Sequence, residues 1–382
     1  MKILYLFRSI AVYGGIERIL VNKMNLLSLN YGYNVSLITT DQGAHTIPYT
    51  LSDNVHMEDL GICFYKKYNY NPISRVWVSY RMKRRYKRLL RQRLLCIQPD
   101  IIVCTTSDNI CSILSVKGSI PLVVESHSIF ERTIEYGNNM FLRKYRRHCF
   151  IKYISRVDCV VTLTNRDAES WRKVNNNVVV IPNFVIKEFD VHSSLNNKNA
   201  IFVGRFDYQK DVSTAIKIWS IVRKKHPEWT LNIYGSGDQE GIVRKMAEEQ
   251  EGIVVHNPSN NIWKCYEDSS FLISTSVFEP FGLVLVEAMA SGLPVVAFDC
   301  PYGPSSIIEN DVSGFLISQH SLYDFSEKIM LLIEAKEKRI MMGMAGQKNA
   351  QKFAPDVVLP LWDKLFSDFL NKKNTNNNKL LK

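Results

Sequence analysis

The sequence predicts an α/β protein made of two doubly wound domains in series. The chain has 382 residues, 46% of them hydrophobic and 22% charged, which is enough apolar material for two cores and too much for a disordered protein. Short apolar runs alternate with longer helical patterns, as expected of parallel sheets covered by helices. The alternation stops at a polar stretch, residues 187–199, and then begins again.

The first domain is predicted to comprise residues 1–182. Lys2–Phe7 reads as a buried strand, Gly14 and Gly15 form a turn, and residues 16–29 have the apolar spacing of a helix. The domain ends at Pro182, because Pro182-Asn183 and the polar stretch interrupt the pattern. The remaining strand candidates are residues 35–39, 101–104, 122–125, 159–163 and 178–181.

The second domain is predicted to comprise residues 183–356. Residues 357–370 follow as one amphipathic helix that carries Trp362 and Phe366. Residues 371–382, rich in Asn and Lys, lack apolar periodicity and are predicted to be a disordered tail. The strand candidates of this half are residues 200–203, 231–234, 253–256, 271–275 and 294–298, and its helical patterns occupy 211–226, 238–249, 282–291 and 321–335.

The net charge of +11 comes from the first domain, where 26 Lys and Arg stand against 13 Asp and Glu. Between Arg81 and Arg93 eight of thirteen residues are basic, and apolar residues recur at helical spacing. A second basic cluster with interleaved aromatic residues lies between Arg143 and Lys152. Solvated helix faces are one interpretation. Attraction to an anionic membrane surface is favoured over nucleic-acid binding, because no nucleic-acid-binding motif accompanies the charge.

Several classes of protein are excluded or disfavoured. No segment reaches the roughly 18 apolar residues of a membrane-spanning helix, and Arg8 interrupts the first apolar run, so a cytoplasmic protein is expected, peripheral at the inner face of the cytoplasmic membrane. The eight cysteines form no Cys-x-x-Cys pair, so they are expected to be reduced core thiols and no structural zinc site is expected. No cofactor is expected either. A nicotinamide dehydrogenase is disfavoured because Gly-x-Gly-x-x-Gly is missing after the first strand.

Two segments have the composition of an anion site. Gly14 and Gly15 let the backbone approach a diphosphate at the start of a helix, although simple turn chemistry explains them equally well. In the second domain, Arg205 and Lys210 follow a strand at its carboxyl end, where open α/β sheets bind ligands. An Arg fork and a Lys point charge together neutralise a diphosphate, so we expect them to converge on one.

The most specific segment spans residues 276–290 and leaves a strand to enter a helix near Gly282. Glu279 lies in the connecting loop, and Glu287 lies about a turn and a half inside the helix, so both face a ligand at the helix N-terminus. The surroundings of Glu287 are apolar, so its carboxylate requires hydrogen-bond donors, a role that ribose hydroxyls suit.

At these residues the sequence resembles the retaining glycosyltransferases of family 4, which have the GT-B architecture of two Rossmann-like domains facing a central cleft. The resemblance implies transfer of a sugar from a nucleoside-diphosphate sugar with retention at the anomeric carbon and without a metal at the diphosphate. It also implies a last helix that crosses back to the first domain. The matching motifs are Gly14 to Arg18, Glu125 to His127, Ile181 to Asn183, Val203 to Arg205 with Lys210, Tyr234 to Gly237, and the pair Glu279 and Glu287.

The resemblance assigns donor-binding roles in the second domain. Glu287 would hold the ribose, Glu279 the hydroxyls of the donor sugar, and Arg205 with Lys210 the diphosphate. His256 would border the nucleobase. Further backbone amides would come from Gly14, Gly15, Phe281, Gly282 and Leu283.

In the first domain, the resemblance places His127 close to the transferred sugar and Glu17 on the acceptor side. The predicted catalytic residues are therefore His127, Glu279, Arg205 and Lys210. No residue is identified by the sequence alone as a covalent nucleophile. A carboxylate pair of the hydrolase type would have to flank the glycosidic bond, whereas ribose better explains Glu287.

The expected function is that of a retaining, metal-independent hexosyltransferase in the synthesis of a bacterial surface polysaccharide, such as lipopolysaccharide or capsule. A UDP-sugar donor is the first expectation, because Pro301 to Ser305 is similar to a segment common in bacterial polysaccharide enzymes. The expected acceptor is a glycan or a lipid-linked glycan. The alternatives are a basic nucleic-acid-binding protein, which would leave Glu279 and Glu287 unexplained, and a catalytically silent GT-B-like protein.

Overall fold

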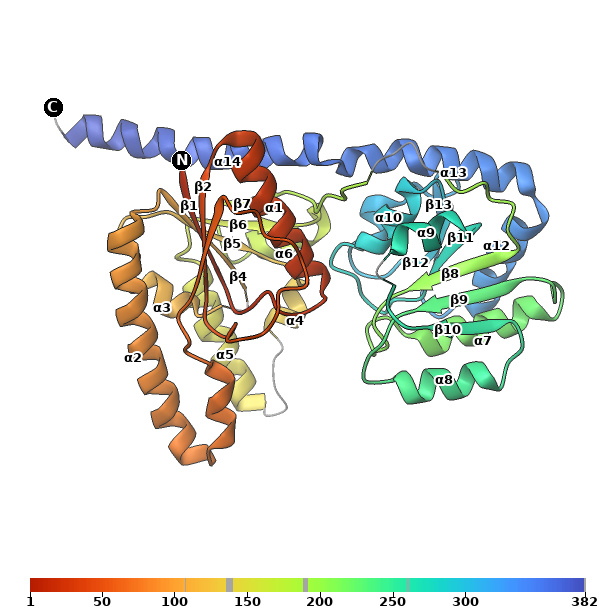
Figure 1. Ribbon diagram of the computed structural model, residues 1–382, viewed down its shortest axis with the longest axis horizontal. Helices are drawn as coiled ribbons and strands as arrows, with labels where there is room; N and C mark the ends of the chain where they lie inside the picture. The colour runs from red at the N-terminus through yellow and green to blue at the C-terminus, as the bar shows by residue number, and fades with distance from the viewer. Residues whose placement is uncertain (107, 135–139, 188–191, 260, 381–382) are drawn as a thin grey trace. The chain divides into compact units, whose positions relative to one another are not determined.

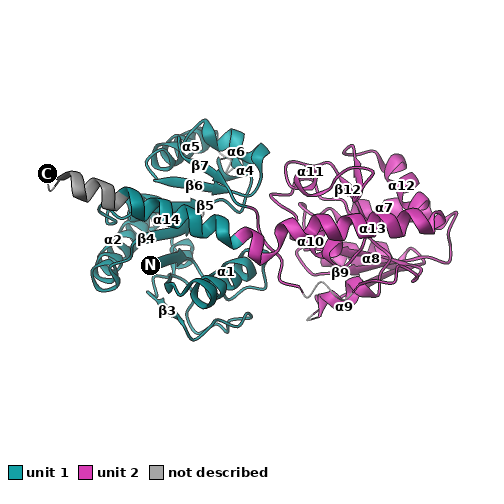
Figure 2. Cartoon of the chain, turned by 90° about the horizontal axis from the view of Figure 1, so that it is seen from above, with its two compact units in different colours: residues 1–181, 359–382 teal, residues 182–358 magenta. Residues whose placement is uncertain are grey.

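The computed structural model describes residues 1–106, 108–134, 140–187, 192–259 and 261–380 (Figure 1). The chain divides into two compact units, coloured separately in Figure 2. Unit 1 comprises Met1–Ile181 with Leu359–Lys382, and unit 2 comprises Pro182–Val358. The boundaries therefore fall within two residues of positions 182 and 356. Four residues of the predicted polar stretch, 188–191, lie outside the described residues.

Unit 1 contains a seven-stranded sheet in the order β3-β2-β1-β4-β5-β6-β7 with every pair parallel. The strand order reverses between β1 and β4, and the carboxyl ends of strands at such a switch point form the usual ligand site of an open α/β sheet. The strands are β1 Lys2–Phe7, β2 Asn34–Thr39, β3 Val55–Asp59, β4 Ile101–Thr105, β5 Leu122–Glu125, β6 Cys159–Thr162 and β7 Val178–Val180.

Helices cover both faces of the unit 1 sheet. Successive side chains of a strand point to opposite faces, so Leu4 and Leu6 join the core beneath α2, whereas Tyr5 faces Leu20 of α1. Helix α2 enters that core through Tyr86, Leu90 and Leu94. The helices are α1 Gly15–Tyr31, η1 Phe64–Asn69, α2 Pro72–Ile97, α3 Ile110–Leu114, α4 Phe130–Ile134, α5 Met140–Ile154 and α6 Asn165–Arg172.

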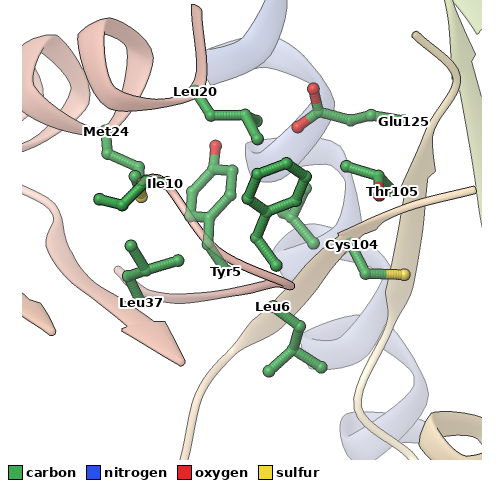
Figure 3. A pocket seen from close by; sticks show the side chains of 11 residues that line it. Tyr5, Leu6, Ile10, Leu20, Met24, Leu37, Cys104, Thr105 and Glu125 are labelled. Carbon is green, nitrogen blue, oxygen red and sulfur yellow. The ribbon is translucent and has the colours of Figure 1, made fainter. Parts of the chain in front are cut away.

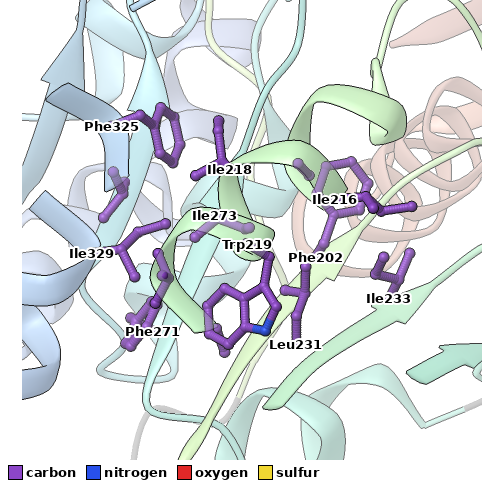
Figure 4. Close-up of a cluster of buried hydrophobic side chains, with 14 of the residues drawn as sticks. Phe202, Ile216, Ile218, Trp219, Leu231, Ile233, Phe271, Ile273, Phe325 and Ile329 are labelled. Carbon is purple, nitrogen blue, oxygen red and sulfur yellow. The ribbon is translucent and has the colours of Figure 1, made fainter. Parts of the chain in front are cut away.

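Unit 2 contains a six-stranded parallel sheet in the order β10-β9-β8-β11-β12-β13, which reverses between β8 and β11. Its hydrophobic core combines aliphatic and aromatic side chains, among them Trp219, which packs against Phe271 with ring centroids 6.5 Å apart (Figure 4). The strands are β8 Asn199–Val203, β9 Thr230–Tyr234, β10 Ile253–His256, β11 Phe271–Ser274, β12 Val295–Phe298 and β13 Gly314–Ile317. The helices are α7 Val212–Arg223, α8 Glu240–Glu248, α9 Ile262–Glu267, α10 Leu283–Ala290, α11 Pro304–Ile307, α12 Leu322–Glu334, α13 Lys336–Ala350 and η2 Gln351–Phe353.

Besides several short helices that were not predicted, the structure differs from the predicted elements at three places. The edge strands β3 and β13 were not predicted: only Val55 is fully buried in β3, and β13 begins with a glycine, a residue that is depleted in strands. Helix α13 was missed because the apolar positions of residues 336–350 have almost no helical periodicity.

The third difference is at the C-terminus. Helix α14, Pro355–Leu380, begins before the predicted residue 357 and continues through most of the segment 371–382, for which disorder was predicted. Once a helix is nucleated, each added residue forms a hydrogen bond without a new nucleation cost, so a polar extension needs no apolar pattern of its own. Residues 381–382 lie outside the described residues.

Candidate active site

Apart from His256 in β10, the predicted donor residues of unit 2 follow the carboxyl ends of β8 and β11, two strands that are neighbours in the sheet. Hydrogen bonds join the two loops: the amide of Val277 donates to the carbonyl of Gln209 at 2.8 Å, and the hydroxyl of Thr275 donates to the carbonyl of Asp211 at 2.8 Å. This junction brings Lys210 Nζ to 2.5 Å from Glu279 Oε2. The two side chains are only 12% and 9% exposed, so the ion pair is well shielded from bulk water.

The backbone of Glu279 is held by the loop that follows β12. The amide of Glu279 donates to the carbonyl of Pro301 at 2.6 Å, and the amides of Tyr302 and Gly303 donate back to the carbonyl of Glu279 at 2.9 and 2.7 Å. A hydroxyl from Ser276 lies 3.3 Å from the carboxylate oxygen Oε2. The segment that suggested a UDP-sugar in the sequence therefore positions Glu279 through its backbone.

Gly282 precedes α10 with a φ of +106°, a conformation that residues with a side chain rarely adopt. The first intrahelical bond comes from the amide of Leu285 to the carbonyl of Gly282, at 3.0 Å, so the preceding amides lie at the positive end of the helix. The ring of Phe281 is buried against Phe353 at 5.4 Å between centroids. Phe281 can therefore offer a ligand its backbone only.

Glu287 is 2% exposed, and its Oε2 accepts a hydrogen bond from the hydroxyl of Tyr266 at 3.0 Å. Tyr266, in α9, is fully buried. A buried carboxylate requires donors, and one of them comes from a residue that the sequence did not single out. No pattern around Tyr266 would have revealed it, because α9 has only six residues and precedes the loop to β11.

Arg205, the other residue predicted to bind the diphosphate, lies in the loop after β8. Its side chain is 68% exposed and bonds within its own loop, to Asp207 at 3.1 Å and to Gln209 at 3.3 Å. His256 at the end of β10 stacks on Tyr234, with centroids 4.4 Å apart, and its Nε2 lies 2.9 Å from Asn232 Oδ1. Burial lowers the pKa of His256, so a neutral ring is available to stack near neutral pH.

Unit 1 has a cavity of about 620 Å³ at the carboxyl ends of β1, β4 and β5. His127 and Glu17, which the sequence predicted as site residues, both line it. Gly14 and Gly15 lie beside it at the start of α1, and the carbonyl of Gly14 accepts a hydrogen bond from Tyr49 at 2.9 Å. The other lining residues are Phe7, Arg8, Ser9, Ala11, Val12, Ile16, Asp41, His45, Tyr65, Thr105, Thr106 and Ser128.

The imidazole of His127 is 6% exposed, and its Nε2 lies 3.1 Å from Glu125 Oε2. Glu125 in turn forms an ion pair with the buried Lys23 at 2.5 Å. Burial by itself would raise the pKa of Glu125, but the charge of Lys23 and the hydrogen bond from His127 outweigh it and lower the pKa. An ionised carboxylate therefore lies behind His127 at neutral pH.

Asp108, beyond the end of β4, gives unit 1 a specific pH dependence. Burial raises its pKa to about 7 from 3.8, although hydrogen bonds from the amide and hydroxyl of Thr105 and the charge of Arg8 oppose this. Between these two values the folded protein binds a proton that the unfolded chain does not. The contribution of Asp108 to stability is therefore present at low pH and is lost as the pH rises through this window.

We expect the free energy of unfolding of Asp108→Asn to depend less on pH than that of the wild type. One proton changes this free energy by at most about 1.4 kcal/mol per pH unit. Urea unfolding at pH 5 and pH 8 measures the difference between the two proteins. Parallel curves for both proteins would mean that Asp108 does not titrate in this range.

Solved structures of known proteins share this fold. Sucrose-phosphate synthase from Thermosynechococcus elongatus matches with a TM-score of 0.79 at 15% identity, and the match covers 97% of this chain and 99% of that protein. HepE from Anabaena, solved in complex with UDP and glucose, matches with a TM-score of 0.74 at 18% identity, covering 96% and 100% of the two chains.

Two family models match successive parts of the sequence: Glycosyltransferase Family 4 over residues 13–189, and Glycosyl transferases group 1 over residues 186–349. The chain belongs to the GT-B glycosyltransferases. This glycosyltransferase is also 26% identical over 392 residues to the amylovoran biosynthesis glycosyltransferase AmsD of Erwinia amylovora, a match that covers 97% of the chain and 99% of the relative. The alternative of a nucleic-acid-binding protein is not favoured.

Within the part of the chain that the structure describes, no three His, Cys, Asp or Glu side chains gather into a metal-binding group. Among the same residues, no helix combines the length and the apolar character needed to cross a membrane.

Proposed function

We propose that this glycosyltransferase transfers a sugar from a UDP-sugar to a hydroxyl of a glycan or lipid-linked glycan, with retention at the anomeric carbon, in the synthesis of a bacterial surface polysaccharide. The observation that carries the proposal is the Lys210–Glu279 ion pair at the N-terminus of α10, with the buried Glu287 further along the same helix. The full-length likeness to a glycosyltransferase named for amylovoran biosynthesis supports the polysaccharide. The UDP in the HepE complex and the segment after Cys300 are the grounds for UDP.

The ion pair fits a donor site because each partner suits one part of a nucleoside-diphosphate sugar. Lys210 and the amides that open α10 provide positive charge for the diphosphate, and Arg205 adds a guanidinium at the end of the neighbouring strand. Glu279 is a hydrogen-bond acceptor for the sugar hydroxyls. A bound diphosphate competes with Glu279 for Lys210, which frees the carboxylate for the sugar.

The reaction then proceeds by departure of the leaving group. The bond between the anomeric carbon and the phosphate oxygen breaks, and the acceptor oxygen bonds to the same carbon from the same face. The acceptor proton passes to the departing diphosphate. The charge on the diphosphate grows as the bond breaks, so Lys210 and Arg205 stabilise the transition state more than the ground state and thereby raise kcat. The proposal assigns no metal to the diphosphate.

The test is the melting temperature of the purified protein with UDP, GDP, ADP and CMP. A ligand of the folded state at about 100 times its Kd adds about 2.7 kcal/mol of stability, so UDP is expected to raise Tm and the others are not. Glu287→Gln, which keeps an acceptor for Tyr266, is expected to abolish the rise. Glu248→Gln on the exposed face of α8 serves as the matched control and keeps it. A Tm unchanged by all four nucleotides would contradict the proposal.

We further infer that unit 1 binds the anionic inner face of the cytoplasmic membrane through α2 and α5. The buried residues of α2 all lie at or beyond Tyr86, so its N-terminal half projects from the core. Trp77 and Tyr80 on that half are 60% and 58% exposed, and Arg81 lies over the Trp77 ring at 4.7 Å. In α5, Phe141 is 78% exposed beside the basic cluster. Exposed aromatic rings among arginines suit an interface of lipid headgroups.

Charge reversal in α2 tests this inference. Each basic residue near an anionic surface contributes about 1 kcal/mol, so replacing Arg84, Arg85 and Arg88 by Glu is expected to weaken binding to phosphatidylglycerol vesicles at least about 100-fold. The matched control reverses three exposed lysines of unit 2, at positions 217, 224 and 245, and changes the net charge equally. Vesicle flotation at 150 mM salt measures both variants. If both variants lose vesicle binding equally, binding depends on the net charge of the protein and not on α2.

A further inference from the structure

Lys23 is a lysine without access to water. It lies in the middle of α1 with 1% of its surface exposed, and its Nζ is 2.5 Å from both carboxylate oxygens of Glu125. Glu125, at the end of β5, is 2% exposed. Removing two charges from water costs about as much as their attraction returns, so a buried pair is rarely more stable than an apolar pair of the same volume. The buried pair is therefore not explained by a gain in the stability of unit 1.

The surroundings of the pair keep it dry. The indole of Trp362, in α14, lies over Lys23 Nζ at 3.9 Å from the ring centroid, and the ring of Tyr5 lies at 5.6 Å. Trp362 is itself only 4% exposed. Apolar side chains such as Leu20 and those drawn around it enclose a pocket beside Glu125 that has no room for a water molecule (Figure 3). Without water, the orientation of the Glu125 carboxylate depends on Lys23.

Glu125 connects this pair to His127. Its Oε2 contacts both Lys23 Nζ and His127 Nε2, the latter at 3.1 Å. An ionised carboxylate only accepts hydrogen bonds, so Nε2 must carry a proton. In the neutral ring, Nδ1 is then the acceptor, and it is the nitrogen that remains for a ligand of the cavity that His127 lines.

We propose that Lys23 is a positioning residue that holds Glu125 so that His127 keeps its proton on Nε2 and offers Nδ1 as an acceptor to a sugar hydroxyl. Trp362, in helix α14, contributes by covering the ammonium group of Lys23 and shielding it from water. The catalytic role of this arrangement rests on the proposed sugar transfer, but the position of the proton on His127 can be measured in the protein alone. In Lys23→Met, Glu125 loses the positive charge that keeps it ionised, so burial favours its protonated form. A protonated Glu125 donates a hydrogen bond to Nε2 of His127, and the ring proton then moves to Nδ1.

The experiment measures the tautomer and the kinetics in the full-length protein. Nitrogen-15 NMR of the histidine rings, with the His127 signals assigned by His127→Gln, reports which nitrogen is protonated. The wild type is expected to show the Nε2-protonated form. Lys23→Met is expected to populate the other tautomer and to lower kcat about 10- to 100-fold with KM within about threefold, less than the roughly 10²- to 10⁴-fold contribution of a general acid or base, because Lys23 acts only through Glu125.

A second variant separates positioning from folding. Lys23→Met with Glu125→Gln removes both charges, so it leaves no unpaired buried charge and is expected to regain the Tm that Lys23→Met loses. The amide of Gln at position 125 can either donate to or accept from Nε2 of His127. Both tautomers of His127 are therefore expected to remain populated, and kcat is expected to stay low. Wild-type kcat and a pure Nε2-protonated ring in this double variant would overturn the inference and make the pair structural only.

The remaining measurements distinguish failure of the inference from failure of the proposed function. Lys364→Met, exposed on α14 near Trp362, is the matched control and keeps the wild-type tautomer and kcat. The rise of Tm with UDP depends on unit 2 and is expected to persist in both Lys23 variants. If UDP raises no Tm even in the wild type, the proposed function fails, while the tautomer shift still decides whether Lys23 positions His127.

Discussion

Replacing Lys210 by Met is expected to lower kcat about 10²- to 10³-fold, the usual cost of removing one group that stabilises transition-state charge. The variant loses the positive charge for the diphosphate and also leaves Glu279 unpaired, 9% exposed, where its charge repels the same diphosphate. UDP release from the donor under saturating substrate measures kcat, and calorimetry measures the donor Kd.

Two further variants test this explanation. Lys210→Met combined with Glu279→Gln is expected to recover part of the donor affinity, because the repulsion is gone, but not kcat. Lys217→Met on the exposed side of α7 is the charge-matched control. If Lys210→Met raises KM and leaves kcat unchanged, Lys210 binds the donor without stabilising the transition state.

The second large effect is expected from Gly303→Ala. A Cβ at this position would lie 1.8 Å from the carbonyl oxygen of Phe281, and backbone on both sides leaves no flexible side chain to move. The clash displaces the two amides that hold the carbonyl of Glu279, so activity is expected to fall by at least about 100-fold. Overpacking usually costs about 1–3 kcal/mol, which corresponds to a fall in Tm of about 2–10 °C.

Gly241→Ala is the matched control for this prediction. Nothing lies within 4 Å of a Cβ at Gly241, which is in helix α8, so the same change should leave activity intact and slightly raise stability. Calorimetry measures the Tm of both variants, and an activity assay measures their kcat. A Gly303→Ala protein with wild-type kcat would show that the loop after β12 does not position Glu279.

The alternation of strands and helices was predictable because each central strand is short, β-branched and buried on both faces. The run at residues 35–39 became a strand for this reason. Helix α13 escaped prediction, since its apolar positions do not follow a period of 3.6, and edge strand β3 escaped because it is short and only Val55 is fully buried in it. In α14, the prediction of a disordered tail was wrong through Leu380 because helix propagation needs no apolar face.

For the site, the sequence by itself determined which chemical groups follow which strands. Lys210 and Glu279 were singled out because each lies beyond the carboxyl end of a strand, where open α/β sheets bind ligands, whereas His127 was singled out by the family resemblance. Glu287 was identifiable as a carboxylate in an apolar helix, whose burial had to be compensated.

Only the tertiary structure decided which of these groups meet. Lys210 and Glu279 are 69 positions apart, and Lys23 and Glu125 are 102 apart, so their pairing depends on the order of strands in each sheet. The contact of Arg205 with Asp207 is likewise a feature of the folded loop, and its predicted role at the diphosphate stays a prediction. The local sequence pattern predicts whether a residue is buried. The partner of a buried charge depends instead on how segments that are distant in the sequence pack together.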